Sequence, residues 1–203
     1  MHKRAFAVLI VLGANCAWGN DSQPVSIESG SVSFEATTNV PGIEIKGTSS
    51  SLAGIANVSH ESGSLLVNQI HVSLPVKSLA TGMKVRDEHM RKYIFTTESG
   101  QTPDVEFTAE QVSCPAAGSG EFACQVNGAL TIRGVAHAFQ TKLNVKEQGT
   151  AFRGSGDGVV KLSDYGIKQP TQFGVSAGNE VKVRMTLAGH VAAAAGATTG
   201  GER

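Results

Sequence analysis

The sequence has no excess of charge of either sign. Its 203 residues include 17 Lys and Arg and 17 Asp and Glu. No run of basic residues alternates with aromatic residues, and a balanced chain has no surplus of cations to neutralise a phosphate backbone. Nucleic acid is therefore not an expected partner.

The length of the chain fits one domain that buries its own core without a metal or disulfide.

The sequence also lacks the patterns of common catalytic and metal sites. It has no His-x-x-x-His or Cys-x-x-Cys spacing, no phosphate-binding loop, and no Gly-x-Ser-x-Gly elbow followed by suitable partners. Asp87 and His89 come closest to an acid and base, but they would point to different sides of a helix. We therefore expect no catalytic residues, no metal site and no cofactor, and we expect that the protein is not an enzyme.

The first 19 residues differ in composition from the rest. A short basic start is followed by an unbroken apolar run over residues 5–12, and small residues stand at 17 and 19. This pattern predicts a signal peptide at 1–19, cleaved before Asn20, and hence a periplasmic or secreted protein. The run is shorter than the roughly 20 apolar residues that a membrane-spanning helix needs. A lipoprotein acylated at Cys16 is the less favoured alternative, because Asn15 stands where a small residue should precede the cysteine.

Cysteine is scarce, and cleavage would leave only Cys114 and Cys124. An even pair in an exported protein predicts a disulfide. The intervening residues 115–120 are typical of a turn, which favours a hairpin with the two cysteines near its end. A free, buried pair remains the alternative.

Apolar residues recur with period two from Val32 onward, and the positions between them are mostly polar. This alternation predicts strands with one dry and one wet face, arranged as an antiparallel sandwich or a closed barrel. One row runs through Leu66, Ile70 and Val72, with Asn68 as its polar exception. Gly154, Gly156 and Gly158 form another row, which gives either close packing or room for a ligand. Residues 193–203 are predicted to be a disordered tail.

Residues 83–95 break the strand pattern. Met83, Met90 and Ile94 share one stripe at helical spacing, which predicts a short amphipathic helix. A solvated helix face is the ordinary explanation of its charges. The functional alternative is a lid, with the apolar side toward a cavity and the polar side at its mouth.

Several motifs resemble those of the YceI family, and they occur in the family's order over about residues 25–191. The segment Leu79-Ala-Thr-Gly-Met-Lys-Val-Arg-Asp-Glu-His-Met-Arg91 resembles the family's Thr-Gly followed by Arg-Asp-x-His-Leu-Arg. Further matches are Pro103-Asp-Val-Glu-Phe107, Gly128-Ala-Leu-Thr-Ile-Arg-Gly-Val135, Asp164-Tyr-Gly-Ile167 and Gly178-Asn-Glu-Val181.

The resemblance implies an all-β fold over residues 20–192: an antiparallel, lipocalin-like β-barrel of about eight strands with one short helix after an early strand. It also implies export to the periplasm and a polyisoprenoid or quinone-type lipid held inside the barrel, which would bring the protein close to membranes. The oligomeric state stays open. Two rival functions are a barrel enzyme that acts on a lipid through His89 and Asp87, and a stress-response or partner-binding module with a filled core.

The alternation and the resemblance together predict the ligand-binding residues. The interior positions are Phe34, Ile45, Leu66, Ile70, Val72, Phe107, Val126, Leu130, Leu143, Val160, Val183 and Met185, with Met83 and Met90 closing one end. Head-group selectivity is assigned to the rim residues Arg86, Asp87, His89 and Arg91. Cys114 is out of phase with Phe107, so pairing it with Cys124 requires a bulge near Gln111.

Overall fold

The computed structural model describes residues 22–192, so the predicted signal peptide at 1–19 and tail at 193–203 lie outside the described residues. The long strands are β1 (Gln23–Thr38), β2 (Glu44–Glu61), β3 (Ser64–Leu74), β4 (Val105–Gly118), β5 (Glu121–Ile132), β6 (Val135–Gln148), β7 (Ala151–Lys161) and β9 (Val175–Val191). The shorter elements are η1 (Val76–Ser78), α1 (Lys84–Met90), the π-helical turn η2 (Arg91–Phe95), η3 (Leu162–Tyr165) and β8 (Thr171–Gln172).

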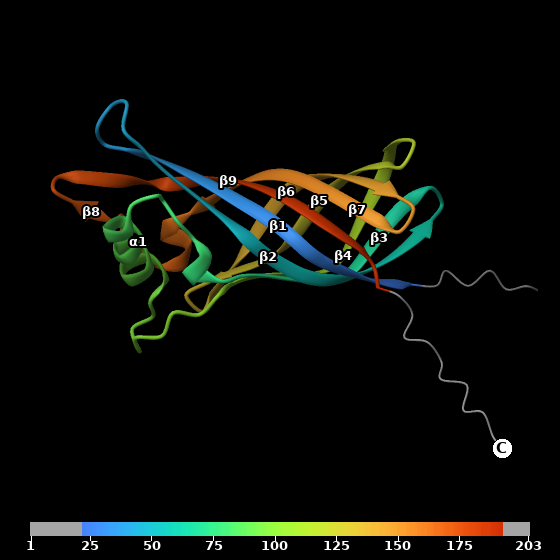
Figure 1. The fold of residues 1–203 in the computed structure, drawn as a ribbon, viewed down its shortest axis with the longest axis horizontal. Helices are drawn as coiled ribbons and strands as arrows, with labels where there is room; N and C mark the ends of the chain where they lie inside the picture. The colour runs from blue at the N-terminus through green and yellow to red at the C-terminus, as the bar shows by residue number, and fades with distance from the viewer. Residues whose placement is uncertain (1–21, 193–203) are drawn as a thin grey trace, which may run out of the picture.

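The eight long strands form one closed antiparallel barrel. Each strand pairs with its neighbour in the order β1 to β7 and then β9, and β9 pairs back onto β1. The predicted all-β barrel of about eight strands is confirmed, and the predicted helix follows β3 (Figure 1). The helix predicted over 83–95 begins one residue later, at Lys84. Met83, the residue before it, has extended backbone.

Three of the hairpins have two-residue turns in which the second residue is glycine. The pairs are Ser62-Gly63, Arg133-Gly134 and Phe173-Gly174, and both members of each pair have positive φ. Positive φ at both central positions is the backbone of the type I′ turn, whose twist matches that of the flanking strands. Glycine takes this conformation without steric cost, whereas Ser62, Arg133 and Phe173 do so against their preference.

The strand β3 carries one more residue than the part of β2 opposite it. Ile55 faces His71, but Asn57 faces Asn68, and Gln69 between them has a φ of 50°. Because side chains alternate along a strand, an extra residue reverses which parity faces inward.

This bulge makes the prediction for Leu66 wrong. Leu65 and Val67 face the interior before the bulge, and Ile70 and Val72 face it afterwards, while Leu66 points outward between the first two. A regular strand would place Leu66 on the same side as Ile70, and the extra residue at Gln69 reverses this.

A second bulge interrupts β4. Its register against β5 shifts between Thr108 and Ala116, and Ala109 and Val112 are both buried although they differ in parity. The bulge required near Gln111 is therefore present, and it turns Cys114 toward the interior.

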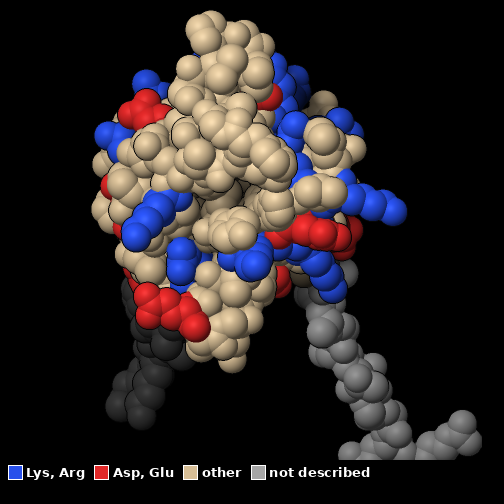
Figure 2. All heavy atoms as spheres, turned by 90° about the vertical axis from the view of Figure 1, so that its left-hand side faces the viewer, with Lys and Arg blue, Asp and Glu red and all other residues tan. Residues whose placement is uncertain are grey.

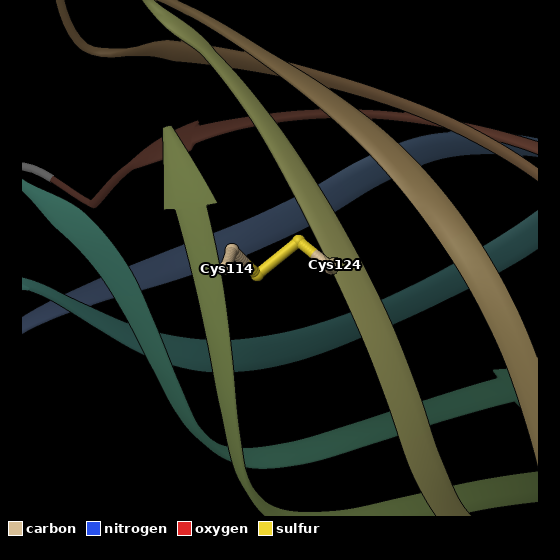
Figure 3. Close-up of a disulfide and its surroundings, with 2 residues drawn as sticks. All are labelled: Cys114 and Cys124. Atoms are coloured by element: carbon tan, nitrogen blue, oxygen red, sulfur yellow. A yellow bond between two sulfur atoms is a disulfide. The ribbon is translucent and has the colours of Figure 1, made fainter. Parts of the chain in front are cut away.

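Cys114 and Cys124 form the predicted disulfide between β4 and β5 (Figure 3). Their Cα atoms are 4.2 Å apart, and both side chains are buried. The bond therefore fastens two neighbouring strands from the inside of the barrel.

Three phenylalanines of the interior lie over glycines of a neighbouring strand. A Cβ atom added to Gly47 or Gly128 would collide with the ring of Phe34 or Phe107, and one added to Gly158 would lie 2.5 Å from Phe139 Cζ. Glycine lets each ring lie along the wall instead of crossing the lumen. The rings thus cover the wall without filling the barrel.

The two ends of the barrel differ. The β2–β3, β4–β5 and β6–β7 turns lie at one end, together with the start of β1 and the end of β9. The other end carries α1, η2, the β1–β2 loop, η3 and the β8–β9 hairpin (Figure 1). The first is called the hairpin end below and the second the helix end.

Candidate functional site

The barrel encloses a cavity of about 1330 Å³. Aliphatic and aromatic side chains from all eight long strands line it, and α1 and the β8–β9 hairpin add residues at the helix end. Seen from this end, the surface is hollowed between uncharged groups (Figure 2). Drug-sized ligand sites seldom exceed about 1,000 Å³, so the interior is hollow and has room for a long apolar molecule.

The structure brings all but one of the predicted interior residues and two of the four predicted rim residues to this cavity. Those that line it are Phe34, Ile45, Ile70, Val72, Met83, Arg86, His89, Met90, Phe107, Val126, Leu130, Leu143, Val160, Val183 and Met185. The interior exception is Leu66, which the bulge at Gln69 turns outward, and the two rim exceptions are Asp87 and Arg91. The contact of the lining residues with a ligand stays a prediction.

Other lining residues escaped the sequence analysis. Leu65, Val67 and Val112 line the cavity because of the two bulges. Phe173 lies at the tip of the β8–β9 hairpin, where the Phe-Gly pair was the available signal. Thr141 faces the interior, but its hydroxyl donates to the backbone carbonyl of Asp157 at 2.7 Å. This polar group is therefore satisfied by the wall itself.

Asp87 holds the segment before α1 and does not line the cavity. Its Oδ1 accepts hydrogen bonds from Thr81 Oγ1 at 2.6 Å and from the Thr81 backbone N–H at 2.7 Å. The Thr81 hydroxyl is the main cause that lowers the pKa of Asp87, and Arg91 and Arg86 lower it further. The carboxylate is thus a fixed acceptor, and the head-group role predicted for it is wrong.

Arg91 has a similar structural task. Its Nη2 donates to the carbonyl oxygens of Leu79 at 3.2 Å and of Lys77 at 3.4 Å, and it too is absent from the cavity wall. Asp87 and Arg91 together anchor residues 77–81 to the helix. Two of the four predicted rim residues therefore position the helix, and Arg86 and His89 remain at the cavity.

His89 joins the helix to the opposite side of the mouth. Its Nδ1 lies 2.9 Å from Gln172 Oε1 on β8, and its ring meets the edge of Tyr93 at a centroid distance of 5.7 Å. Since the Asp87 carboxylate is turned toward Thr81, His89 and Asp87 do not form an acid–base pair.

A buried tyrosine lies behind the mouth. Tyr165 of η3 meets His137 edge to face at 6.0 Å. Burial, with a smaller contribution from Asp164, raises the pKa of Tyr165 to about 12, so its phenol is neutral at physiological pH.

Within residues 22–192, no cluster of three or more His, Cys, Asp or Glu side chains has the arrangement of a metal site. Over the same residues, no helix is long and apolar enough to cross a bilayer.

The sequence profile of the YceI-like domain matches residues 25–188. This chain belongs to the YceI-like family. The match covers nearly the whole barrel, and the resemblance inferred from the 79–91 segment is confirmed. A comparison with curated proteins gives no significant match.

Solved structures of similar fold include a polyisoprenoid binding domain from Saccharophagus degradans, described as implicated in plant cell wall breakdown. It is 18% identical, with a TM-score of 0.60 over 83% of this chain and 98% of that one. BcnA of Burkholderia cenocepacia is also 18% identical, with a TM-score of 0.59 over 78% and 95% of the two chains. The Campylobacter jejuni YCEI protein is 16% identical, with a TM-score of 0.58 over 76% and 90%. At these identities the likeness establishes the fold.

Proposed function

We propose that this YceI-like protein is an exported lipid-binding protein that holds a polyisoprenoid or quinone-type chain inside its barrel, as a carrier or for sequestration. The observation that carries the proposal is the hollow interior of about 1330 Å³, walled by apolar side chains from every long strand. The polyisoprenoid binding domain from Saccharophagus degradans shares this fold and supports the choice of ligand.

Burial of apolar surface supplies the affinity in this proposal. Each methylene that leaves water for an apolar site gains about 0.8 kcal/mol, so a chain with about ten buried methylenes gains about 8 kcal/mol before the cost of ordering it. Such binding selects length and shape. Arg86 and His89, which line the cavity at the helix end, are then the predicted contacts for a head group.

Organic extraction tests the proposal. Protein purified from its native compartment should release a long-chain isoprenoid that mass spectrometry identifies, and the emptied protein should rebind prenols or quinones. The intact mass of the same sample should correspond to a chain that begins at Asn20 if the protein is exported and processed. Protein that is repeatedly empty and has no affinity for prenols or quinones would contradict the lipid-binding function.

A further inference from the structure

Five large apolar side chains are exposed at the helix end, around the opening of the cavity. Phe173 is 95% exposed at the tip of the β8–β9 hairpin. Met83, Val85 and Tyr93 on the helix segment and Ile43 in the β1–β2 loop are between 46% and 58% exposed. All five line the mouth of the cavity, and together they are called the apolar crown below. Exposed apolar groups that gather in this way mark an interaction surface.

Phe173 occupies a position that is unfavourable for phenylalanine within the described chain. Its φ is 50°, which glycine or asparagine adopts more readily, so phenylalanine is a costly residue at this turn. Its nearly complete exposure shows that packing within the barrel does not compensate for that cost. A partner outside the chain can do so by burying the ring.

Basic side chains accompany the crown. Arg86, Arg133 and Lys168 line the mouth, and Lys84 and Lys92 flank the crown residues of the helix. Within residues 22–192 none of these five has a carboxylate within 4 Å. Figure 2 shows blue Lys and Arg atoms at several places around the uncharged centre of this face, with fewer red ones.

The hairpin end carries glutamates beside its cations, and Lys146 is paired there with Glu121 at 3.2 Å. Each of its three turns is flanked by a glutamate, namely Glu61, Glu121 and Glu147. At the helix end the lining residues include one carboxylate, Glu98, against the three cations named above, so this end suits an anionic surface.

We propose that the apolar crown and its basic side chains dock the mouth of the barrel onto a membrane that contains anionic phospholipid. Aromatic and aliphatic side chains with nearby Lys and Arg are the combination that binds at a bilayer interface. In this orientation an apolar chain passes between the bilayer and the cavity without crossing water. The docking does not require a bound lipid, so it can be tested apart from the proposed function.

Vesicle co-sedimentation tests this surface. The purified protein should bind vesicles of phosphatidylcholine and phosphatidylglycerol in equal parts, bind pure phosphatidylcholine less, and dissociate as salt is added. The double variant Phe173→Ser/Val85→Ser should bind the mixed vesicles about tenfold more weakly. Lys84→Gln/Lys92→Gln should weaken binding to mixed vesicles and leave binding to neutral ones unchanged.

Matched controls separate docking from general stickiness. Ile55→Ser/Val159→Ser removes two apolar side chains that are 60% and 50% exposed on the barrel wall, and Lys142→Gln/Lys146→Gln removes two cations from β6. Both controls should bind vesicles like the wild type, and thermal unfolding should show that all four variants are folded.

Three results would overturn the proposal. The first is that the protein binds no vesicles, and the second is that the crown and control variants lose vesicle affinity equally. The third is a dimer in solution that the crown variants dissociate, because a second copy of the chain would then cover the crown. Protein that yields a lipid on extraction but binds no vesicle would refute the docking surface alone. Protein that binds vesicles but never yields or rebinds a lipid would refute the proposed ligand alone.

Discussion

Among the alternating glycines of β7, Gly154 is the one whose missing side chain leaves open space. A Cβ atom there would meet Leu187 at 3.6 Å, an ordinary contact, whereas Gly156 and Gly158 are covered by Leu143 and Phe139. Gly154 also lines the cavity, and the other two do not. The glycine row therefore leaves room for a ligand at Gly154 and allows close packing at Gly156 and Gly158.

Replacing Gly154 with leucine should shorten the longest prenol that the protein binds. The new side chain would enter the cavity without displacing the wall, so unfolding free energy should change by less than about 1.5 kcal/mol. A chain-length series of prenols measures the effect. Ser155→Leu, on the outward side of the same strand, is the control and should bind like the wild type.

Gly158→Ala should behave differently, because its Cβ would lie 2.5 Å from Phe139 Cζ and force that ring to move. We expect a loss of about 1–3 kcal/mol in unfolding free energy.

If Gly154→Leu bound every prenol with wild-type affinity, the cavity at β7 would not be part of the binding site.

Asp87→Asn should destabilise the anchor of the helix segment. The charged acceptor for two hydrogen bonds from Thr81 would be lost, at a cost of about 1–2 kcal/mol in unfolding free energy measured with denaturant. Glu88→Gln, on the exposed side of α1, is the control and should have little effect.

The Asp87 carboxylate also makes the folding stability depend on pH, and the sign of this dependence follows from its pKa shift. Its pKa is lowered below the ordinary 3.8, so its stabilising contribution is complete above that value and is lost as the pH falls through the lowered folded-state pKa. The difference in stability between wild type and Asp87→Asn should therefore shrink in acid. A difference that stays constant down to pH 2 would contradict the role given to Asp87.

At the scale of single residues, the sequence predicted inward-facing positions wherever a strand is regular. Ile45, Val126 and Val183 follow from alternation alone. The prediction for Leu66 failed because one added residue at Gln69 reverses the parity, and the polar Asn68 in an otherwise apolar row is the sign of that break. The role of Asp87 depends on its contact with Thr81, and spacing alone cannot show which way a helical carboxylate turns.

At the scale of elements, the hairpin of β4 and β5 is the part of the wall where regular pairing is interrupted. Between Thr108 and Ala116 its register shifts, and the disulfide joins the two strands within this stretch. The bond thus supplements a ladder that the bulge has weakened. The cysteine spacing predicted the bond, and the mismatch in parity predicted the bulge.

The double variant Cys114→Ala/Cys124→Ala should lose about 2–4 kcal/mol of unfolding free energy, because the cysteines are 10 positions apart in the sequence and the open loop has more freedom in the unfolded chain. Denaturant unfolding measures this loss. Wild-type protein treated with a reductant serves as the matched control and should approach the variant. Equal stability of the oxidised wild type and the variant would show that the bond adds nothing to the fold.

At the scale of the whole molecule, alternation predicted a sheet with a dry face but could not tell a sandwich from a barrel, and the family motifs were needed to choose the barrel. Whether a barrel is hollow depends on its diameter and on the summed volume of its inward side chains. Rings laid over glycines on neighbouring strands help to keep this one open. Such pairings depend on register, which the sequence pattern alone does not specify.

The described chain begins and ends at adjacent points of the wall. Val25 pairs with Val191, and the Ala192 N–H donates to the Pro24 carbonyl at 2.8 Å. A short linker could therefore join these two points, and new termini could be opened at the β6–β7 turn, also at the hairpin end. Such a circular permutant would keep every strand neighbour and leave the mouth untouched. The chain can thus be permuted or fused to another protein at the hairpin end without altering the cavity mouth at the helix end.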